Sequence, residues 1–207
     1  MYTPAQFAEE RPAVLHALIR EFALGTLVTA GPDGPQASLV PMFLDAGRNA
    51  LRCHLAKSNP HAAAIGGQKA LILFQGPSDY VSPSWYPAKV EHGKVVPTWN
   101  YCAVEVRGVC TRVEDSEWLV RHVNELTAQQ EAAFDLPWSV SDAPKDFIDG
   151  LARAIVGVEV AIESMSGKWK LSQNRSRQDR DGAISGLKAR RTHRSLELAA
   201  RMEIAGD

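Results

Sequence analysis

Apolar and polar residues follow two different periods along this chain. Between residues 12 and 22 the apolar side chains recur every three or four positions, which is typical of an amphipathic helix. Residues 101–113 and 156–162 instead alternate apolar and polar, which predicts strands with one buried face. The apolar run 70–74 has the length of a fully buried strand. The pattern therefore predicts a protein that contains both helices and sheet.

Turn-forming residues separate the first predicted strands. Gly31-Pro32-Asp33-Gly34 has the composition of a hairpin turn and joins a strand over 24–29 to one over 36–44. The segment 45–49 is a second turn, and it leads into a strand over 50–55. Strands and turns at this spacing predict an antiparallel meander.

The remaining segments add elements around these strands. A short helix is predicted over 59–65, with Asn59 as its cap and Pro60 at its first position. A long loop is predicted over 76–97 and a helix over 118–134. The tail from residue 175 onward is polar and helix-prone. Five to seven antiparallel strands with peripheral helices place the chain in the α+β class, as a small antiparallel β-barrel.

Length and composition narrow the class of protein. The chain has 207 residues, of which 45% are hydrophobic and 23% are charged, as in soluble globular proteins. We expect a barrel domain over 1–175 and a C-terminal helical, partly basic extension over 176–207. A net charge of −1 argues against a protein that is basic overall and binds nucleic acid through its whole surface.

Cysteine usage and the N-terminal residues bear on location. Cys53, Cys102 and Cys110 follow no metal-ligand spacing and are interpreted as buried reduced thiols. The chain opens with acidic residues rather than a basic start and an apolar stretch, and no apolar run approaches membrane-spanning length. We therefore expect a cytoplasmic protein with no membrane contact.

Two segments carry backbone groups and side chains that are suited to bind a ligand with a phosphate group. Ser38 to Met42 carries a proline inside a strand, which belongs at a sheet edge or a bulge and leaves backbone groups free for a ligand. From His54 to His61 a strand ends and a helix begins, and Lys57 and His61 are placed to add charge-assisted hydrogen bonds to a phosphate. An ordinary edge-strand proline and an ordinary helix start are the alternatives.

Two further segments are richer in aromatic and polar side chains than a plain surface requires. Several Trp and Tyr rings lie in residues 80–86 and 96–101. Such rings are suited to contact a flat ligand or a partner subunit, and the alternative is that they cover the ends of a small barrel. Residues 167–175 place Trp169 among lysines, amides and an arginine. Since no phosphate loop, GxSxG elbow or HExxH is present, we predict no catalytic residue and no metal ligand.

Five motifs carry a resemblance to a known family. In order along the chain they are MYTPAQF, HLAKSNPH, YVSPSWY, VPTWNY and GKWKLSQNR. Together they resemble the PaiB-type FMN-binding negative transcriptional regulators, over most of the chain. That resemblance implies the split β-barrel also found in pyridoxine 5′-phosphate oxidase and flavin reductases. It further implies a homodimer with flavin mononucleotide (FMN) at the subunit interface.

The same resemblance implies which residues hold FMN. One strand runs along the isoalloxazine ring, the strand end and helix start that follow hold the phosphate, and two residues approach from the second subunit. Lys170 and Ser172 stand where the oxidase has Arg and His, so oxidation of that vitamin is not expected. The implied cofactor-binding residues are Ser38, Leu39, Val40, Pro41, His54, Leu55, Lys57, Asn59, His61, Trp99, Asn100, Lys170, Gln173, Asn174 and Arg175.

Three functions remain open at this point. The first is a flavin-dependent transcriptional repressor, for which the basic tail would contact DNA, although that tail is equally well a solvated helical face. The second is a flavin-dependent oxidoreductase, in which Trp99, Lys170 and Gln173 would line the substrate face. The third is haem binding, with His54, His61 or His92 as axial ligand. The basic residues of the tail are Arg175, Arg177, Arg180, Lys188, Arg190, Arg191 and Arg194.

Overall fold

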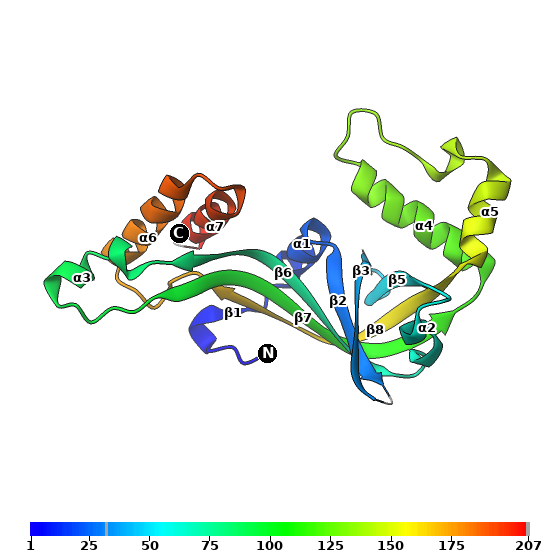
Figure 1. The fold of residues 1–207 in the computed structure, drawn as a ribbon, viewed down its shortest axis with the longest axis horizontal. Coiled ribbons are helices and arrows are strands. Elements are labelled where there is room, and N and C mark those ends of the chain that lie inside the picture. Colours follow the sequence, from blue (N-terminus) through cyan, green and yellow to red (C-terminus); the bar gives the residue numbers. More distant parts are fainter. Residues whose placement is uncertain (32, 206–207) are drawn as a thin grey trace. The chain divides into compact units, whose positions relative to one another are not determined.

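One antiparallel sheet of eight strands organises the described residues, 1–31 and 33–205, of this computed structural model (Figure 1). Its strand order is β3-β2-β6-β7-β8-β5-β4, with β1 added beside β8. The order has two free ends, β3 and β4, so the sheet is not closed. The strands are β1 (Ala8–Glu9), β2 (Leu24–Gly31), β3 (Gly34–Pro41), β4 (Phe43–Asp45), β5 (Ala50–Ala56), β6 (Lys69–Val81), β7 (Thr98–Val113) and β8 (Ile155–Lys170).

The same described residues also form seven α-helices and three short 3-10 helices. The 3-10 helices are η1 (Ala5–Phe7), η2 (Pro83–Trp85) and η3 (Val140–Asp142). The α-helices are α1 (Pro12–Glu21), α2 (Pro60–Ala64), α3 (Ala88–Glu91), α4 (Ser116–Glu131), α5 (Lys145–Arg153), α6 (Arg177–Arg190) and α7 (His193–Ile204). No helix among the described residues has the length and apolar character needed to cross a membrane.

The β2–β3 hairpin confirms the first predicted turn. The two strands pair from Leu24 with Pro41 to Gly31 with Gly34. Gly34 has a φ of +123°, a conformation that favours glycine, and Pro32 lies outside the described residues. Because β3 is an end strand and Pro41 is its last residue, the predicted edge position of this proline is confirmed.

The predicted meander is interrupted within its second strand, although the second predicted turn is confirmed by the antiparallel pairing of β4 with β5. The expected strand over 36–44 is broken at Met42, and its two parts, β3 and β4, lie at opposite ends of the sheet order. Pro41 has no N–H for a ladder, and the Met42 N–H donates instead to the Ala23 carbonyl at 2.8 Å. The buried Met42 side chain therefore stands at the break, where the chain leaves one strand and enters the next.

Two long strands also correct the predicted loops. Residues 76–81 are not loop but the second half of β6, and 166–170 belong to β8 rather than following it. In both segments buried residues recur at every second position, a period that Gly76-Pro77 and Gly167 obscured in the sequence. The helical tail is confirmed as α6 and α7, whereas α5 was not predicted.

The chain divides into two compact units that share the long strands β6, β7 and β8. One unit comprises residues 16–74 and 105–165, and its core includes Leu27, Ile72 and Val158. The other comprises 1–15, 75–104 and the residues from 166 onward, and its core includes Tyr86, Leu171, Leu187 and Leu198. The predicted domain boundary at 175/176 falls just before α6 and stays a prediction.

Candidate functional site

A buried histidine holds together the polar corner that the sequence predicted. His61 is 3% exposed, and its two ring nitrogens lie 2.9 Å from Thr29 Oγ1 and 2.8 Å from Ser38 Oγ. Burial lowers the pKa of His61, so the neutral ring donates from one nitrogen and accepts at the other. The side chain thus joins β2, β3 and α2, and it positions Ser38 rather than supplying charge.

Asn59 and Lys57 complete this corner. The Asn59 side-chain oxygen accepts the His61 backbone N–H at 3.0 Å and caps α2, as the sequence predicted, while Nδ2 donates to Ser38 Oγ at 3.4 Å. Lys57 is exposed, and its ammonium has no protein partner among the described residues. The corner therefore presents a hydroxyl, an amide and one unpaired cation, which is the donor set that a phosphate requires.

The two faces of β3 differ sharply in what they expose. Ser38 and Val40 point to the face that carries His61, and Val40 is buried. Leu39 and Pro41 point to the opposite face, where Leu39 is 63% exposed. The apolar part of the predicted ring-binding strand is thus accessible.

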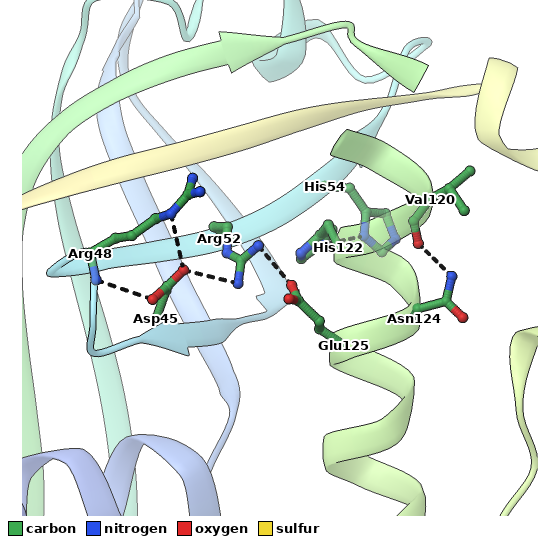
Figure 2. A network of polar contacts seen from close by, with 8 residues as sticks. All are labelled: Asp45, Arg48, Arg52, His54, Val120, His122, Asn124 and Glu125. Carbon is green, nitrogen blue, oxygen red and sulfur yellow. Dashed lines mark hydrogen bonds and ion pairs between the residues drawn. The ribbon is translucent and has the colours of Figure 1, made fainter. Parts of the chain in front are cut away.

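His54 and Leu55 take different roles from those of the corner. The His54 Nδ1 lies 3.3 Å from the Nε2 of His122 on α4 (Figure 2), and Trp118 stacks on the His122 ring with the ring centres 5.1 Å apart. Leu55 is part of the core. Burial lowers the pKa of both histidines, and that of His122 falls to about 3. The imidazole pair is therefore neutral near pH 7.

Sequence reasoning missed a buried ion pair beside these histidines. Arg52 on β5 is almost fully buried and lies 3.2 Å from Asp45 Oδ2 and 2.7 Å from Glu125 Oε2 (Figure 2). Its guanidinium also lies 4.6 Å from the centre of the Phe43 ring. The available signal was an arginine between Leu51 and Cys53 in a strand that is otherwise apolar.

The other predicted residues lie in the second unit. Asn100 is fully buried, and its Nδ2 donates to Ser172 Oγ at 2.9 Å and to Met202 Sδ at 3.4 Å. Trp99 is 52% exposed and meets Tyr80 edge to face. Lys170 donates from Nζ to Thr98 Oγ1 at 2.6 Å. Asn100 is thus a core residue here, whereas Trp99 presents an accessible ring.

Gln173 closes the turn that follows β8. Its Oε1 accepts the Leu171 N–H at 2.7 Å, and its Nε2 donates to the Trp169 carbonyl at 2.6 Å, around a left-handed Ser172 with φ +65°. The Arg175 guanidinium lies 5.1 Å from the centre of the Tyr86 ring, and Asn174 is exposed. The amide of Gln173 is therefore used by the backbone.

Two of the haem-ligand candidates are engaged within the protein. Both His61 ring nitrogens have hydroxyl partners, and His54 pairs with His122. His92 is exposed, and its Nδ1 accepts the Lys94 N–H at 3.0 Å. Haem ligation by His61 would require the loss of at least one of these buried hydrogen bonds.

Comparison with known proteins decides the family. The family model described as "Putative FMN-binding domain" matches residues 1–164. The chain belongs to this FMN-binding family. A protein of Emericella nidulans is 37% identical over 90% of either chain. The protease synthase and sporulation protein PAI 2 of Bacillus subtilis is 28% identical over 98% of this chain and 97% of its own.

These matches confirm the PaiB-type resemblance and the split-barrel fold. Among solved structures, the FAD and heme binding protein of Mycobacterium smegmatis superimposes with a TM-score of 0.60 at 14% identity, over 79% of this chain and 73% of that one. At that identity the likeness shows the fold alone. The site residues of this FMN-binding family member stay predictions.

Proposed function

We propose that this protein binds FMN at the polar corner of Ser38, Lys57 and Asn59. The observation that carries the proposal is the family match over residues 1–164, which contains that corner. The unpaired Lys57 ammonium and the Ser38 and Asn59 donors, oriented by His61, suit a phosphate monoester. Because β3 is an end strand, the backbone groups on its free edge are available to the polar edge of an isoalloxazine ring.

Two of the remaining predicted residues would complete the cofactor site from a second subunit. Trp99 offers an exposed aromatic face, and Lys170 adds a cation held by Thr98. When bound, FMN supplies one- and two-electron redox chemistry, while the protein supplies binding, orientation and electrostatics. The three free, buried cysteines support a reducing compartment such as the cytoplasm.

Flavin titration tests the phosphate corner. Lys57→Gln removes one cation, and we expect FMN to bind roughly tenfold more weakly because one charge-assisted hydrogen bond is lost. Riboflavin, which has no phosphate, should bind equally to both proteins. The matched control is Lys94→Gln, an exposed lysine of the other unit. Quenching of flavin fluorescence measures the affinities of the three proteins for FMN and for riboflavin, and unchanged FMN binding by Lys57→Gln would refute the assignment.

We propose that the FMN-bound protein represses transcription and that its flavin reports the redox state of the cell. The resemblance to the PaiB-type regulators and the basic residues of α6 and α7 support this proposal. Gel shifts with the DNA upstream of the protein's own gene, at low salt and with oxidised or reduced flavin, test it. If the DNA is not retarded in either redox state, the repressor function is refuted.

The second candidate is a flavin-dependent oxidoreductase. The observation that favours it is the exposed Trp99 ring on β7, together with the Lys170 ammonium of β8, which donates to Thr98 on β7. Such a surface can receive a flat or anionic substrate. Steady-state NAD(P)H oxidation with added FMN should then exceed the rate of free flavin. Lys170→Met should lower that rate while leaving the flavin spectrum unchanged.

A further inference from the structure

Residues of the C-terminal part of the chain line a cavity, and none of the residues of the phosphate corner belongs to its lining. Its volume is about 710 Å³, which lies within the range of small-molecule sites. One face of α6 forms its main wall, because the lining residues of that helix are spaced by three or four positions. The lining comprises Gln173, Arg175, Arg177, Arg180, Asp181, Ile184, Ser185, Lys188 and Glu203.

The cavity is cationic although the whole chain is slightly acidic. Four arginine and lysine side chains face two carboxylates there, a net charge of +2 in a protein of net charge −1. Both carboxylates are already engaged, Glu203 with Lys188 at 2.5 Å and Asp181 with Arg177 at 3.9 Å. The excess of positive charge therefore rests on the remaining arginines.

Arg175 and Arg180 have no carboxylate partner among the described residues. Arg175 lies over the Tyr86 ring, and Arg180 donates to the Met202 carbonyl while its Nε is buried without an acceptor. These contacts orient the two guanidiniums but leave their charge uncompensated. Arginine in a preset orientation is the side chain best suited to phosphate and carboxylate groups.

We propose that this cavity binds a small polyanion, a metabolite that carries phosphate or several carboxylate groups. A concave site suits a compact ligand, whereas a DNA duplex requires cations along an outer surface. Of the tail's other basic residues, Arg190 is tied to Asp79 at 2.6 Å, and Arg194 is exposed outside the cavity. Ile184 is the one apolar side chain of the lining, so the ligand is polar throughout. This site is additional to the proposed FMN site.

Calorimetric titration of the full-length protein with pyrophosphate and with citrate tests the proposal and separates the two anion chemistries. We expect one site per chain for at least one probe. Arg175→Gln should weaken binding about tenfold, because one uncompensated charged hydrogen-bond donor is lost. Asp181→Asn should strengthen it, because a competing carboxylate is gone. Arg194→Gln, an equal change of charge outside the cavity, should leave it unchanged.

Three results would overturn the proposal. The first is absence of binding at millimolar concentrations of both probes. The second is equal weakening by Arg175→Gln and Arg194→Gln, which would indicate surface attraction of the kind that DNA uses. The third is displacement of pyrophosphate by FMN in the Lys57→Gln protein, which would make the cavity the flavin-phosphate site. Failure of FMN binding alone, with pyrophosphate still bound, would refute the proposed function and leave this inference intact.

Discussion

Arg52 and His122 are polar side chains buried in one unit, and each has a partner that lies far away in the sequence. Arg52 is compensated by Glu125 as well as by Asp45, and His122 contacts His54 (Figure 2) and stacks on Trp118. A buried charge is tolerated only when its partners are present, and a buried imidazole is tolerated only when neutral. The stability of the folded unit therefore depends on the polar contacts of these two residues.

Removal of the Arg52 charge should destabilise the fold. Arg52→Met keeps the aliphatic stem but leaves Asp45 and Glu125 without their cation, and we expect a loss of about 2 kcal/mol in the free energy of unfolding. The two carboxylates are partly exposed, which keeps the loss below that of a fully buried pair. Urea denaturation measures it. Arg48→Met, at an exposed arginine 3.8 Å from the same Asp45, should change the stability by less than about 0.5 kcal/mol.

His122 should make stability fall in acid. Its pKa is lowered to about 3 by burial and by the neighbouring His54 and Arg52, whereas in the unfolded chain it titrates near 6.5. The unfolded state thus binds the proton first. Stability is full above pH 6.5 and falls as the pH drops from there toward 3, by at most about 1.4 kcal/mol per pH unit for this group.

Substitution of the histidine isolates this contribution. His122→Leu should flatten the dependence of the unfolding midpoint on pH between 6.5 and 5, measured by urea denaturation at several pH values. His193→Leu, at an exposed histidine, should leave the slope as it is. An unchanged slope in the His122→Leu protein would contradict the assignment.

At the scale of elements, close approach decides where α4 packs. Gly157 on β8 pairs with His54 on β5, and an added Cβ at Gly157 would lie 2.3 Å from Cζ3 of Trp118. Only a residue without a side chain leaves room for this ring on the sheet. The same Trp118 ring stacks on His122, so the position of α4 and the histidine contacts depend on one glycine.

Gly157→Ala should therefore displace Trp118 at a cost of about 1–3 kcal/mol in unfolding free energy. Near-ultraviolet circular dichroism reports the tryptophan, and thermal unfolding reports the stability. Gly47→Ala is the matched control, because its added Cβ meets nothing nearer than an Asp45 oxygen at 3.6 Å. Equal stability of the two variants would show that the ring adapts without strain.

At the scale of the whole molecule, the open sheet leaves an apolar face on β2 and β3. Leu24 is 55% and Leu39 is 63% exposed, and they stand on that face together with Ala37 and Pro41. Apolar patches of this kind mark interaction sites in soluble proteins. The proposed homodimer would cover this face.

Leu39→Asp should therefore convert the dimer to a monomer and weaken FMN binding, since the proposed site needs residues of both subunits. Light scattering after size-exclusion chromatography measures the mass, and flavin fluorescence measures the affinity. Val90→Asp, at a valine on α3 that is 92% exposed, should affect neither property. A monomeric parent protein with full FMN affinity would refute the dimeric site.

Local sequence determined the elements whose signals are local. The β2–β3 turn, the Asn59 cap of α2, the edge position of Pro41 and the helical tail all follow from turn chemistry, capping and period. The family motifs likewise predicted the split barrel from the sequence alone. These features depend on residues within a few positions of one another, which a sequence displays directly.

Tertiary structure alone decided which side chains meet. The sequence placed His61 and Lys57 together as two cations at a phosphate, yet the hydroxyls of Thr29 and Ser38 bury His61 as a neutral ring. It gave no sign that the two halves of 36–44 lie at opposite ends of the sheet order, or that the tail's arginines line a cavity. Burial and partner distance depend on residues remote in the chain, and those quantities set charge and chemistry.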